Sequence, residues 1–298
     1  MKYENPTIPE GINVSEEHPL KDFAILAGGI GLATILLVVA LSFAAGWLVK
    51  FVPFELEQKL AQDNVVSALA PSDKNKAQPS EQHQQIEHYL QNLANELSVA
   101  QQLPEGMSIQ VHYVDDETVN AFATLGGHVV MFSGLLKKLP HENALAMVMA
   151  HEIAHIKHRD PIIAAGRGLT VGLALAALTG FGDSSASHYL VNQVNLLTQL
   201  SFNRSQETEA DREAMRTLQN HYGHVIGADT LFEVLQASHD GLEPPEILSS
   251  HPITEDRINA IKQHQFAGSD TRKLLKDLPD FIPRQSTKAD PQKLIYKN

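Results

Sequence analysis

The sequence predicts a mainly α-helical domain with a small β-sheet, an α+β fold, that follows one N-terminal transmembrane helix. The first observation is an apolar run, residues 23–49, that contains no charged side chain. As a helix this run would span about 40 Å, which exceeds the roughly 30 Å of a bilayer core. Helical patterns also lie within residues 86–97, 143–158, 197–218, 228–237 and 253–265. The alternation typical of strands is found in residues 109–114 and 128–132.

The apolar run is bounded like a membrane anchor. Lys21 and Asp22 precede it, and Trp47 and Lys50 stand at its far end. An aromatic ring and a cation suit the membrane interface. A cleaved signal peptide would have a basic leader and a shorter apolar core, whereas this leader is acidic and this run is long. We therefore expect an uncleaved single-pass anchor in the cell membrane, although lysines on both sides leave its orientation open.

The rest of the chain divides by composition. Residues 1–22 are polar, acidic and proline-containing, which is typical of a flexible tail. Residues 50–80 combine a helical pattern with a polar linker, so we expect a juxtamembrane helix and a domain boundary there. The soluble domain is then expected at residues 81–268, and a charged, loosely packed tail at residues 269–298.

A second apolar run, residues 162–181, is rich in glycine and alanine and contains Arg167. The arginine and the glycines argue against a second membrane span. We expect a buried or mobile helix and loop near the candidate site. A lid that dips into the membrane is the alternative.

The composition excludes some functions. Lysine and arginine number 23 against 35 aspartate and glutamate residues, which gives a net charge of −12. Nucleic acid is not an expected partner, because phosphate binding along its backbone needs a basic surface. There is no cysteine, so a disulfide framework, a thiol ligand and a thiol nucleophile are all excluded. The sequence leaves the oligomeric state open.

His151 and His155 lie in the helical pattern of residues 143–158, in the order H-E-x-x-H. Residues four apart share one face of a helix, so both imidazoles can bind one metal ion. Glu152 lies beside that face and can reach a water molecule on the metal. Two histidine ligands with a glutamate as general base is the arrangement of zinc hydrolases.

The chain also offers a third ligand. A catalytic zinc ion has three protein ligands and an open position. Glu207 and Asp211 lie one turn apart in the pattern of residues 197–218, on a stripe made mainly of leucine and alanine. We therefore expect Glu207 to bind the metal. Asp211 is expected to accept the outer N–H of a zinc-bound histidine and so to fix its tautomer.

Together, H-E-x-x-H at residues 151–155 and E-x-x-A-D at residues 207–211 resemble the gluzincin metalloendopeptidases of metallopeptidase family forty-eight, which includes HtpX, the type one CAAX prenyl protease and BepA. The resemblance covers roughly residues 82–265. It implies a zincin-like peptidase domain that hydrolyses peptide bonds in proteins, with Zn²⁺ as the cofactor. It assigns the metal to His151, His155 and Glu207, and the base to Glu152.

The resemblance extends to a substrate-binding strand. Asn120 and the segment that starts at Gly127 resemble the family's Asn-Ala segment and its active-site edge strand. An edge strand at residues 127–131 can receive an extended substrate by strand addition. We therefore expect substrate contacts at Asn120, Gly127, His128 and Val129. An ordinary sheet strand and a turn residue are the alternatives.

His251, between Ser250 and Pro252, resembles a C-terminal element that comes close to the metal in BepA-type relatives. A neutral imidazole can fill the fourth zinc position and displace water. It can instead donate a hydrogen bond to the oxyanion of the reaction, or simply lie on the surface. Arg204 and Arg257 are possible partners of the metal-site carboxylates or possible oxyanion stabilisers, and the sequence does not separate these roles.

The sequence thus predicts a membrane-anchored zinc metalloendopeptidase that acts on protein or peptide substrates. The resemblance favours protein quality control, and by analogy a peptidase domain in the periplasm. The alternative is a chaperone-like client-binding protein with a closed zinc site, against which the presence of Glu152 argues. A prenyl-peptide protease is a further alternative, but its membrane chamber needs several spans and this chain offers one secure span.

Overall fold

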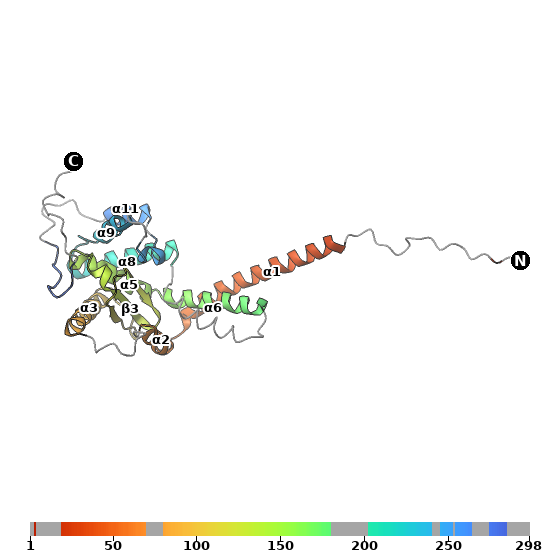
Figure 1. The fold of residues 1–298 in the computed structure, drawn as a ribbon, viewed down its shortest axis with the longest axis horizontal. Helices are drawn as coiled ribbons and strands as arrows, with labels where there is room; N and C mark the ends of the chain where they lie inside the picture. The colour runs from red at the N-terminus through yellow and green to blue at the C-terminus, as the bar shows by residue number, and fades with distance from the viewer. Residues whose placement is uncertain are drawn as a thin grey trace.

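The computed structural model describes residues 3, 19–69, 80–179, 202–239, 245–252, 254–263 and 274–284. Figure 1 shows a body of helices around a small sheet, from which one long helix, α1 (Pro19–Leu48), projects towards the N-terminus. The predicted class, mainly helical with a small sheet behind an N-terminal apolar helix, is therefore confirmed. Most of the expected N-terminal tail and linker, and part of the expected C-terminal tail, lie outside the described residues.

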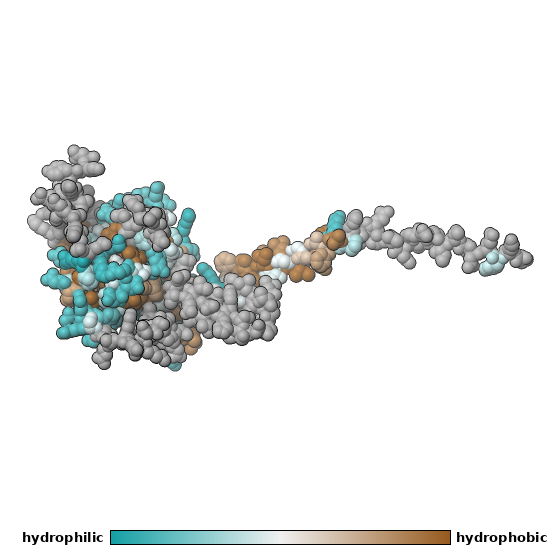
Figure 2. Space-filling view, in the orientation of Figure 1, coloured by the Kyte–Doolittle hydropathy of each residue, from teal (hydrophilic) through white to brown (hydrophobic). Residues whose placement is uncertain are grey.

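The apolar side chains of α1 face outward. Figure 2 shows this helix as a hydrophobic rod outside a largely hydrophilic body, and within it only Gly46 is buried. Within the segment Pro19–Phe51, which includes the short 3-10 turn η1 (Val49–Phe51), an 18-residue stretch has a mean hydropathy of 2.6. Among the described residues this segment is the one helix long and apolar enough to cross a membrane. The structure therefore fits a single-pass anchor.

The helix after the anchor is fastened to the body. The Glu57 carboxylate of α2 (Phe54–Leu69) accepts the backbone N–H of Gly126 at 3.0 Å and the Arg159 Nε–H at 3.1 Å. Glu57 is buried, and a buried carboxylate needs such partners. The helix predicted after the apolar run thus exists and is joined to the body by a specific buried contact.

The second apolar run forms α6 (Asp160–Thr179), which lies beside α1. Small residues allow the two helices to approach closely. A Cβ atom at Gly166 would lie 2.9 Å from Val49 Cγ1, and one at Gly46 would lie 3.0 Å from Arg167 Nε. The base of α1 is therefore braced by α6 as well as by α2.

The sheet has three strands, β1 (Gln110–Val114), β2 (Ala121–Thr124) and β3 (His128–Phe132), in the order β1-β3-β2. β3 pairs in parallel with β1 and antiparallel with β2. The expectation of an edge strand at residues 127–131 is therefore wrong, because β3 is the central strand and its main chain is paired on both sides. The edge strand on the site's side of the sheet is β2, which contacts α5.

The hydrophobic core surrounds α5 (Glu142–Lys157), in which every residue from Glu142 to Ile156 is buried. α5 contacts α3 (Glu81–Ala100), α6, α8 (Arg204–Tyr222), α9 (Thr230–His239) and β2. The remaining short helices are α4 (Ser133–Leu136), η2 (Leu125–Gly127), α10 (Ile247–Ser250) and α11 (Glu255–Gln263). A helix enclosed on all sides gives its polar side chains fixed positions.

Of the expected helix of residues 197–218, residues 197–201 lie outside the described residues, and the observed helix α8 runs from Arg204 to Tyr222. Phe202 and Asn203 are not helical, and Asn203 is the N-cap of α8 with an extended backbone, φ −78° and ψ 162°. Its side chain accepts the N–H groups of Ser205 and Gln206, and Gln206 completes a capping box. The cap fixes where α8 begins, and Glu207 follows in its first turn.

Candidate metal centre

Two histidines of α5 meet at their Nε2 atoms. His151 and His155 lie one turn apart on the helix, and their Nε2 atoms are 3.1 Å from each other. The other ring nitrogen of each contacts a carboxylate: His151 Nδ1 lies 2.9 Å from Asp211 Oδ1, and His155 Nδ1 lies 2.9 Å from Asp160 Oδ2. An Nδ1–H that donates to a carboxylate leaves the Nε2 lone pair of a neutral imidazole free for a metal. A cation between the two Nε2 atoms would stabilise this arrangement of facing lone pairs.

Glu207 closes the third side of this arrangement. Its Oε2 lies 3.5 Å from His151 Nε2 and its Oε1 lies 3.4 Å from His155 Nε2. Zinc bonds of about 2.0–2.1 Å in a tetrahedral site separate the ligand atoms by about 3.3–3.4 Å. The three separations of 3.1, 3.4 and 3.5 Å therefore fit the edges of one zinc tetrahedron.

A fourth donor lies beside these three. His251, at the end of α10, places its Nδ1 3.3 Å from His151 Nε2 and 3.0 Å from Glu207 Oε1. With His155 included, one ligand atom from each of the four residues lies within 4.8 Å of the others, and all four residues are buried. His251 thus lies buried beside the other three candidate ligands, not on the surface.

Arg257 of α11 orients the carboxylates of α8. Its Nε and Nη2 contact the two oxygens of Asp211 at 2.6 and 2.9 Å, and its Nη1 lies 2.8 Å from Glu207 Oε2. Arg204 is exposed and takes no part. Of the two arginines that the sequence left open, Arg257 is the structural partner of both Asp211 and Glu207.

The charges of the cluster favour a bound cation. Asp160, Asp211, Glu152 and Glu207 contact the histidines. Among the described contacts of these carboxylates, the one permanent cation is Arg257, which bonds to Asp211 and Glu207. Four negative charges against one positive charge leave three uncompensated. A divalent ion would remove most of that excess, as buried charges require.

The ionisation of the cluster points the same way. Burial opposes a charge on His151, but hydrogen bonds to Asp211 and Glu207 outweigh burial and raise its pKa to about 10. Burial would also raise the pKa of Glu207, but its hydrogen bonds to His151, His155 and His251 hold that pKa far below its usual value. Positive charge is favoured at the point where the imidazoles and the carboxylate meet.

The Glu152 carboxylate lies beside the cluster and is held by strand β2. One carboxylate oxygen accepts the backbone N–H of Ala123 at 2.7 Å, and the other lies 3.5 Å from His251 Nε2. The contact with Ala123 ties the candidate base to strand β2. The cavity bounded by His151, Glu152 and His251 holds about 20 Å³, about enough for one water molecule. In this structure the site is closed to a peptide.

Two of the groups that hold the site were not predicted from the sequence. Asp160, the first residue of α6, positions His155 and also accepts the Gln206 side-chain N–H at 2.5 Å. Phe202 stacks on the His155 ring with a centroid distance of 4.0 Å. Asp160 follows the H-E-x-x-H motif closely, so a search for a carboxylate near each histidine would have found it. Phe202 has no such signal.

The expected substrate residues do not gather at the cluster. His128 lies in the central strand and contacts His112, with the two ring nitrogens 2.8 Å apart. Burial and the neighbouring His112 lower the pKa of His128 to about 4, so it is neutral at ordinary pH. Val129 is enclosed between β1 and β2, and Gly127 turns the chain at φ +85°. Asn120 is buried just before β2.

Comparison with known proteins identifies the domain. Residues 80–265 match the model of the family described as Peptidase family M48. The mitochondrial metalloendopeptidase OMA1 of Schizosaccharomyces pombe is 34% identical over 157 residues, covering 52% of this chain and 46% of the relative. The putative β-barrel assembly-enhancing protease of Vibrio cholerae is 31% identical over 186 residues, covering 58% and 38%.

The β-barrel assembly-enhancing protease of Escherichia coli K12 is similar over a comparable segment, at 31% identity across 158 residues, 49% of this chain and 32% of the relative. The chain thus spans less than half the length of these curated relatives. The matched segment includes α5 and α8, which carry the two motifs and the clustered side chains. The chain belongs to peptidase family M48.

Proposed function

We propose that this protein is a membrane-anchored zinc metalloendopeptidase of protein quality control. The observation that carries the proposal is the buried cluster of His151, His155 and Glu207, with Glu152 one residue from the first ligand. The family and the relatives named as proteases support the hydrolysis of protein substrates. The outward apolar surface of α1 supports the anchor.

In this proposal His151, His155 and Glu207 hold Zn²⁺, while Asp160 and Asp211 keep the two imidazoles in the tautomer that binds metal. The ion, when bound, would polarise the scissile carbonyl and lower the pKa of a water molecule towards about 7. Glu152 takes the proton from the attacking water and passes it to the leaving amine. The Ala123 N–H holds the Glu152 carboxylate in place for both transfers.

The substrate is expected along β2. In an antiparallel pair, residues alternate between those that bond to the neighbouring strand and those whose main chain points away from it. The Phe132 N–H donates to the Asn120 carbonyl, and the Ala123 N–H donates to Glu152. Ala121 and Ala123 therefore present their main chain at the outer edge of β2. A peptide added there would lie beside the proposed base, and the main-chain contacts would require little sequence preference.

One observation favours regulated access. His251 lies at the fourth corner of the ligand cluster, and Ile247 of the same short helix donates its N–H to the Val119 carbonyl just before β2. The segment of α10 and His251 thus covers both the ligand position and the start of the substrate edge. A closed site of this kind also supports the alternative of a client-binding chaperone, which the presence of Glu152 argues against.

The test is a single substitution. Glu152→Gln should keep the fold and the zinc content but lower casein cleavage by about 10²–10⁴-fold, because an amide cannot accept the proton of water. The purified full chain in detergent is compared with this variant and with Glu105→Gln, an exposed glutamate far from the cluster in sequence. Equal cleavage by the parent and by Glu152→Gln would remove Glu152 as the base, and no cleavage by a zinc-loaded parent would favour the chaperone.

A further inference from the structure

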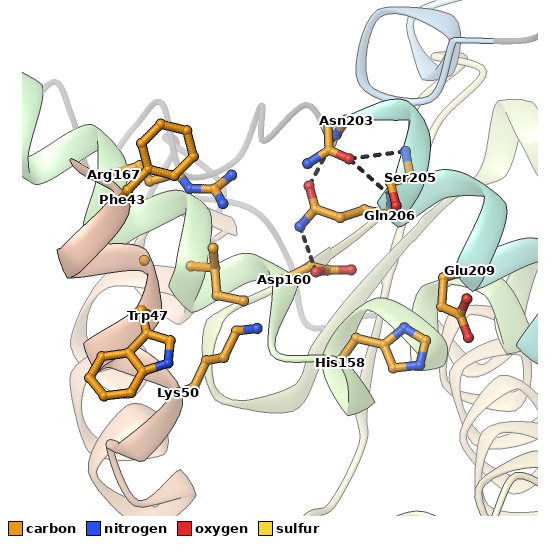
Figure 3. A pocket seen from close by; sticks show the side chains of 12 residues that line it. Phe43, Trp47, Lys50, His158, Asp160, Arg167, Asn203, Ser205, Gln206 and Glu209 are labelled. Carbon is orange, nitrogen blue, oxygen red and sulfur yellow. Dashed lines mark hydrogen bonds between the residues drawn. The ribbon is translucent and has the colours of Figure 1, made fainter. Parts of the chain in front are cut away.

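A second hollow lies where α1 meets the body. It has a volume of about 440 Å³, within the range of about 300–1,000 Å³ found for small-molecule sites. α1 and η1 supply Phe43, Trp47 and Lys50, α6 supplies Asp160 and Arg167, and the start of α8 supplies Gln206 (Figure 3). We call it the anchor pocket. Nothing in the proposed peptidase reaction uses it.

Two cations, Lys50 and Arg167, line the anchor pocket together with two carboxylates, Asp160 and Glu209. Among the described residues, no carboxylate lies within ion-pair distance of Lys50 or Arg167. The two carboxylates that line the pocket are already engaged, Asp160 with His155 and Gln206, and Glu209 with Arg212. In Figure 3 the side chains of Lys50 and Arg167 both extend from the side of α1 and α6 into the pocket. Among the described residues, Lys50 and Arg167 are therefore the two groups of the pocket available to bind an anion.

The pocket also lies at the end of the apolar helix that is proposed to span the membrane. Phe43 and Trp47 belong to the last turns of the apolar helix and are 68% and 61% exposed. Aromatic rings and lysines at the end of a span lie at the level of the lipid headgroups. The same pocket thus combines two cations with an apolar wall that continues along α1.

We propose that the anchor pocket binds the headgroup of an anionic membrane phospholipid. Its phosphate is held by the ammonium of Lys50 and the guanidinium of Arg167, since guanidinium groups bind phosphate in a bidentate manner. Its acyl chains leave along the Phe43 face of α1. The proposal rests on the membrane anchoring proposed above.

The pocket and the metal cluster share a wall. Asp160 lines the pocket with one side while its carboxylate positions His155, and Gln206 lines it while capping the helix that carries Glu207. A lipid headgroup would therefore touch the groups that orient two of the proposed zinc ligands. The proposed peptidase centre would then respond to which lipid headgroup occupies the anchor pocket.

The test uses the one tryptophan of the chain, Trp47, which lines the pocket. Dihexanoyl phosphatidylglycerol is titrated into the purified full chain in a non-ionic detergent, and tryptophan fluorescence is recorded. We expect a saturable change that needs about tenfold more lipid in Arg167→Gln and in Lys50→Gln, the loss expected for one charge-assisted contact. Lys59→Gln, an exposed lysine of α2 outside the pocket, is the matched control and should follow the parent.

Each other outcome overturns the proposal. Equal saturation by dihexanoyl phosphatidylcholine would show that the site does not distinguish headgroup charge. Equal saturation by inorganic phosphate would show that the site binds free phosphate. An unchanged curve in both pocket variants, or an equal loss in Lys59→Gln, would exclude the pocket. Circular dichroism and zinc content verify folding, and exposed Lys50 serves as the test if Arg167→Gln fails to fold. This experiment does not measure proteolysis, so it stands even if the peptidase proposal is wrong. The anchor is tested separately: extraction of the chain from membranes by alkaline carbonate would show that it is not anchored.

Discussion

Glu207 is the residue on which the other groups of the cluster converge. Its two oxygens lie 2.8–3.5 Å from His151, His155, His251 and Arg257, and 1% of its surface is exposed. A carboxylate so placed joins α5, α8, α10 and α11 at one point. Its removal takes away a ligand and also leaves a guanidinium and three imidazoles without a shared acceptor.

The first prediction at this scale is that Glu207→Ala loses the metal. With one of three protein ligands removed, elemental analysis of the purified chain should give well below one Zn²⁺ per molecule, against about one for the parent. Glu96→Ala, an exposed glutamate of α3, is the control and should keep its zinc. Unchanged zinc in Glu207→Ala would exclude this residue as a ligand.

A second prediction concerns His251. If its imidazole closes the fourth position, His251→Ala should cleave casein faster than the parent at equal zinc content, because the position becomes open to water and substrate. If the imidazole instead donates to the oxyanion, the same variant should turn over more slowly with its zinc retained. The position of Nδ1 at the corner of the cluster favours the first result. Activity and zinc both equal to the parent would assign His251 no role at the site.

At the scale of elements, the turn between β2 and β3 sets the sheet that supports Glu152. Gly126 and Gly127 have φ values of +75° and +85°. A Cβ at Gly127 would lie 2.1 Å from the Ser108 carbonyl oxygen and 3.0 Å from Phe54. The left-handed backbone and the close approach of two segments both require glycine.

Gly127→Ala is therefore expected to destabilise the protein more than Gly223→Ala does. Gly223, the C-cap of α8, has φ +77° but no atom within 4 Å of an added Cβ, so it bears only the cost of the left-handed backbone, about 1–2 kcal/mol. Gly127→Ala adds a clash that costs about 1–3 kcal/mol more. Chemical denaturation of the two variants measures the difference. Equal losses would mean that the Ser108 segment moves aside freely.

The sequence predicts local elements better than their assembly. The spacing of His151 and His155 needs only helix geometry, and both are brought together with Glu207 in the structure. The place of β3 in the sheet depends on which strands pair with it, and alternation does not report pairing. Its nearly continuous apolar sequence, His-Val-Val-Met-Phe, was a signal for a central strand. Phe202 and Arg257 reach the site through tertiary packing, which no local pattern contains.

At the scale of the whole molecule, the apolar helix and the body are one unit. α1 is braced by α6 and followed by α2, whose Glu57 is bonded to Gly126 and Arg159. The sequence predicted a helix followed by a linker between the anchor and the domain; the helix, α2, is docked on the body, and residues 70–79 of the linker lie outside the described residues. Hydrogen bonds in a buried network of this kind strengthen one another.

The prediction at this scale is topological. We expect one uncleaved span at residues 23–49 with the peptidase domain on the periplasmic side. Two reporters fused after Asn298 measure the side, alkaline phosphatase for the periplasm and a fluorescent protein for the cytoplasm. Activity of the phosphatase fusion is the expected result, and fluorescence with an inactive phosphatase would reverse the orientation. A chain shortened at its N-terminus would indicate a cleaved signal peptide instead of an anchor.

The docking of α2 through Glu57 has a consequence for which bonds such an enzyme can cut. A catalytic domain on a flexible linker samples many distances from its membrane. A domain docked on the base of its anchor keeps its proposed zinc ligands at one distance from the bilayer. The chain would then cut polypeptides at a fixed distance from the lipid surface. Substrate choice would depend on how far a segment stands from the bilayer, and less on which amino acids it contains.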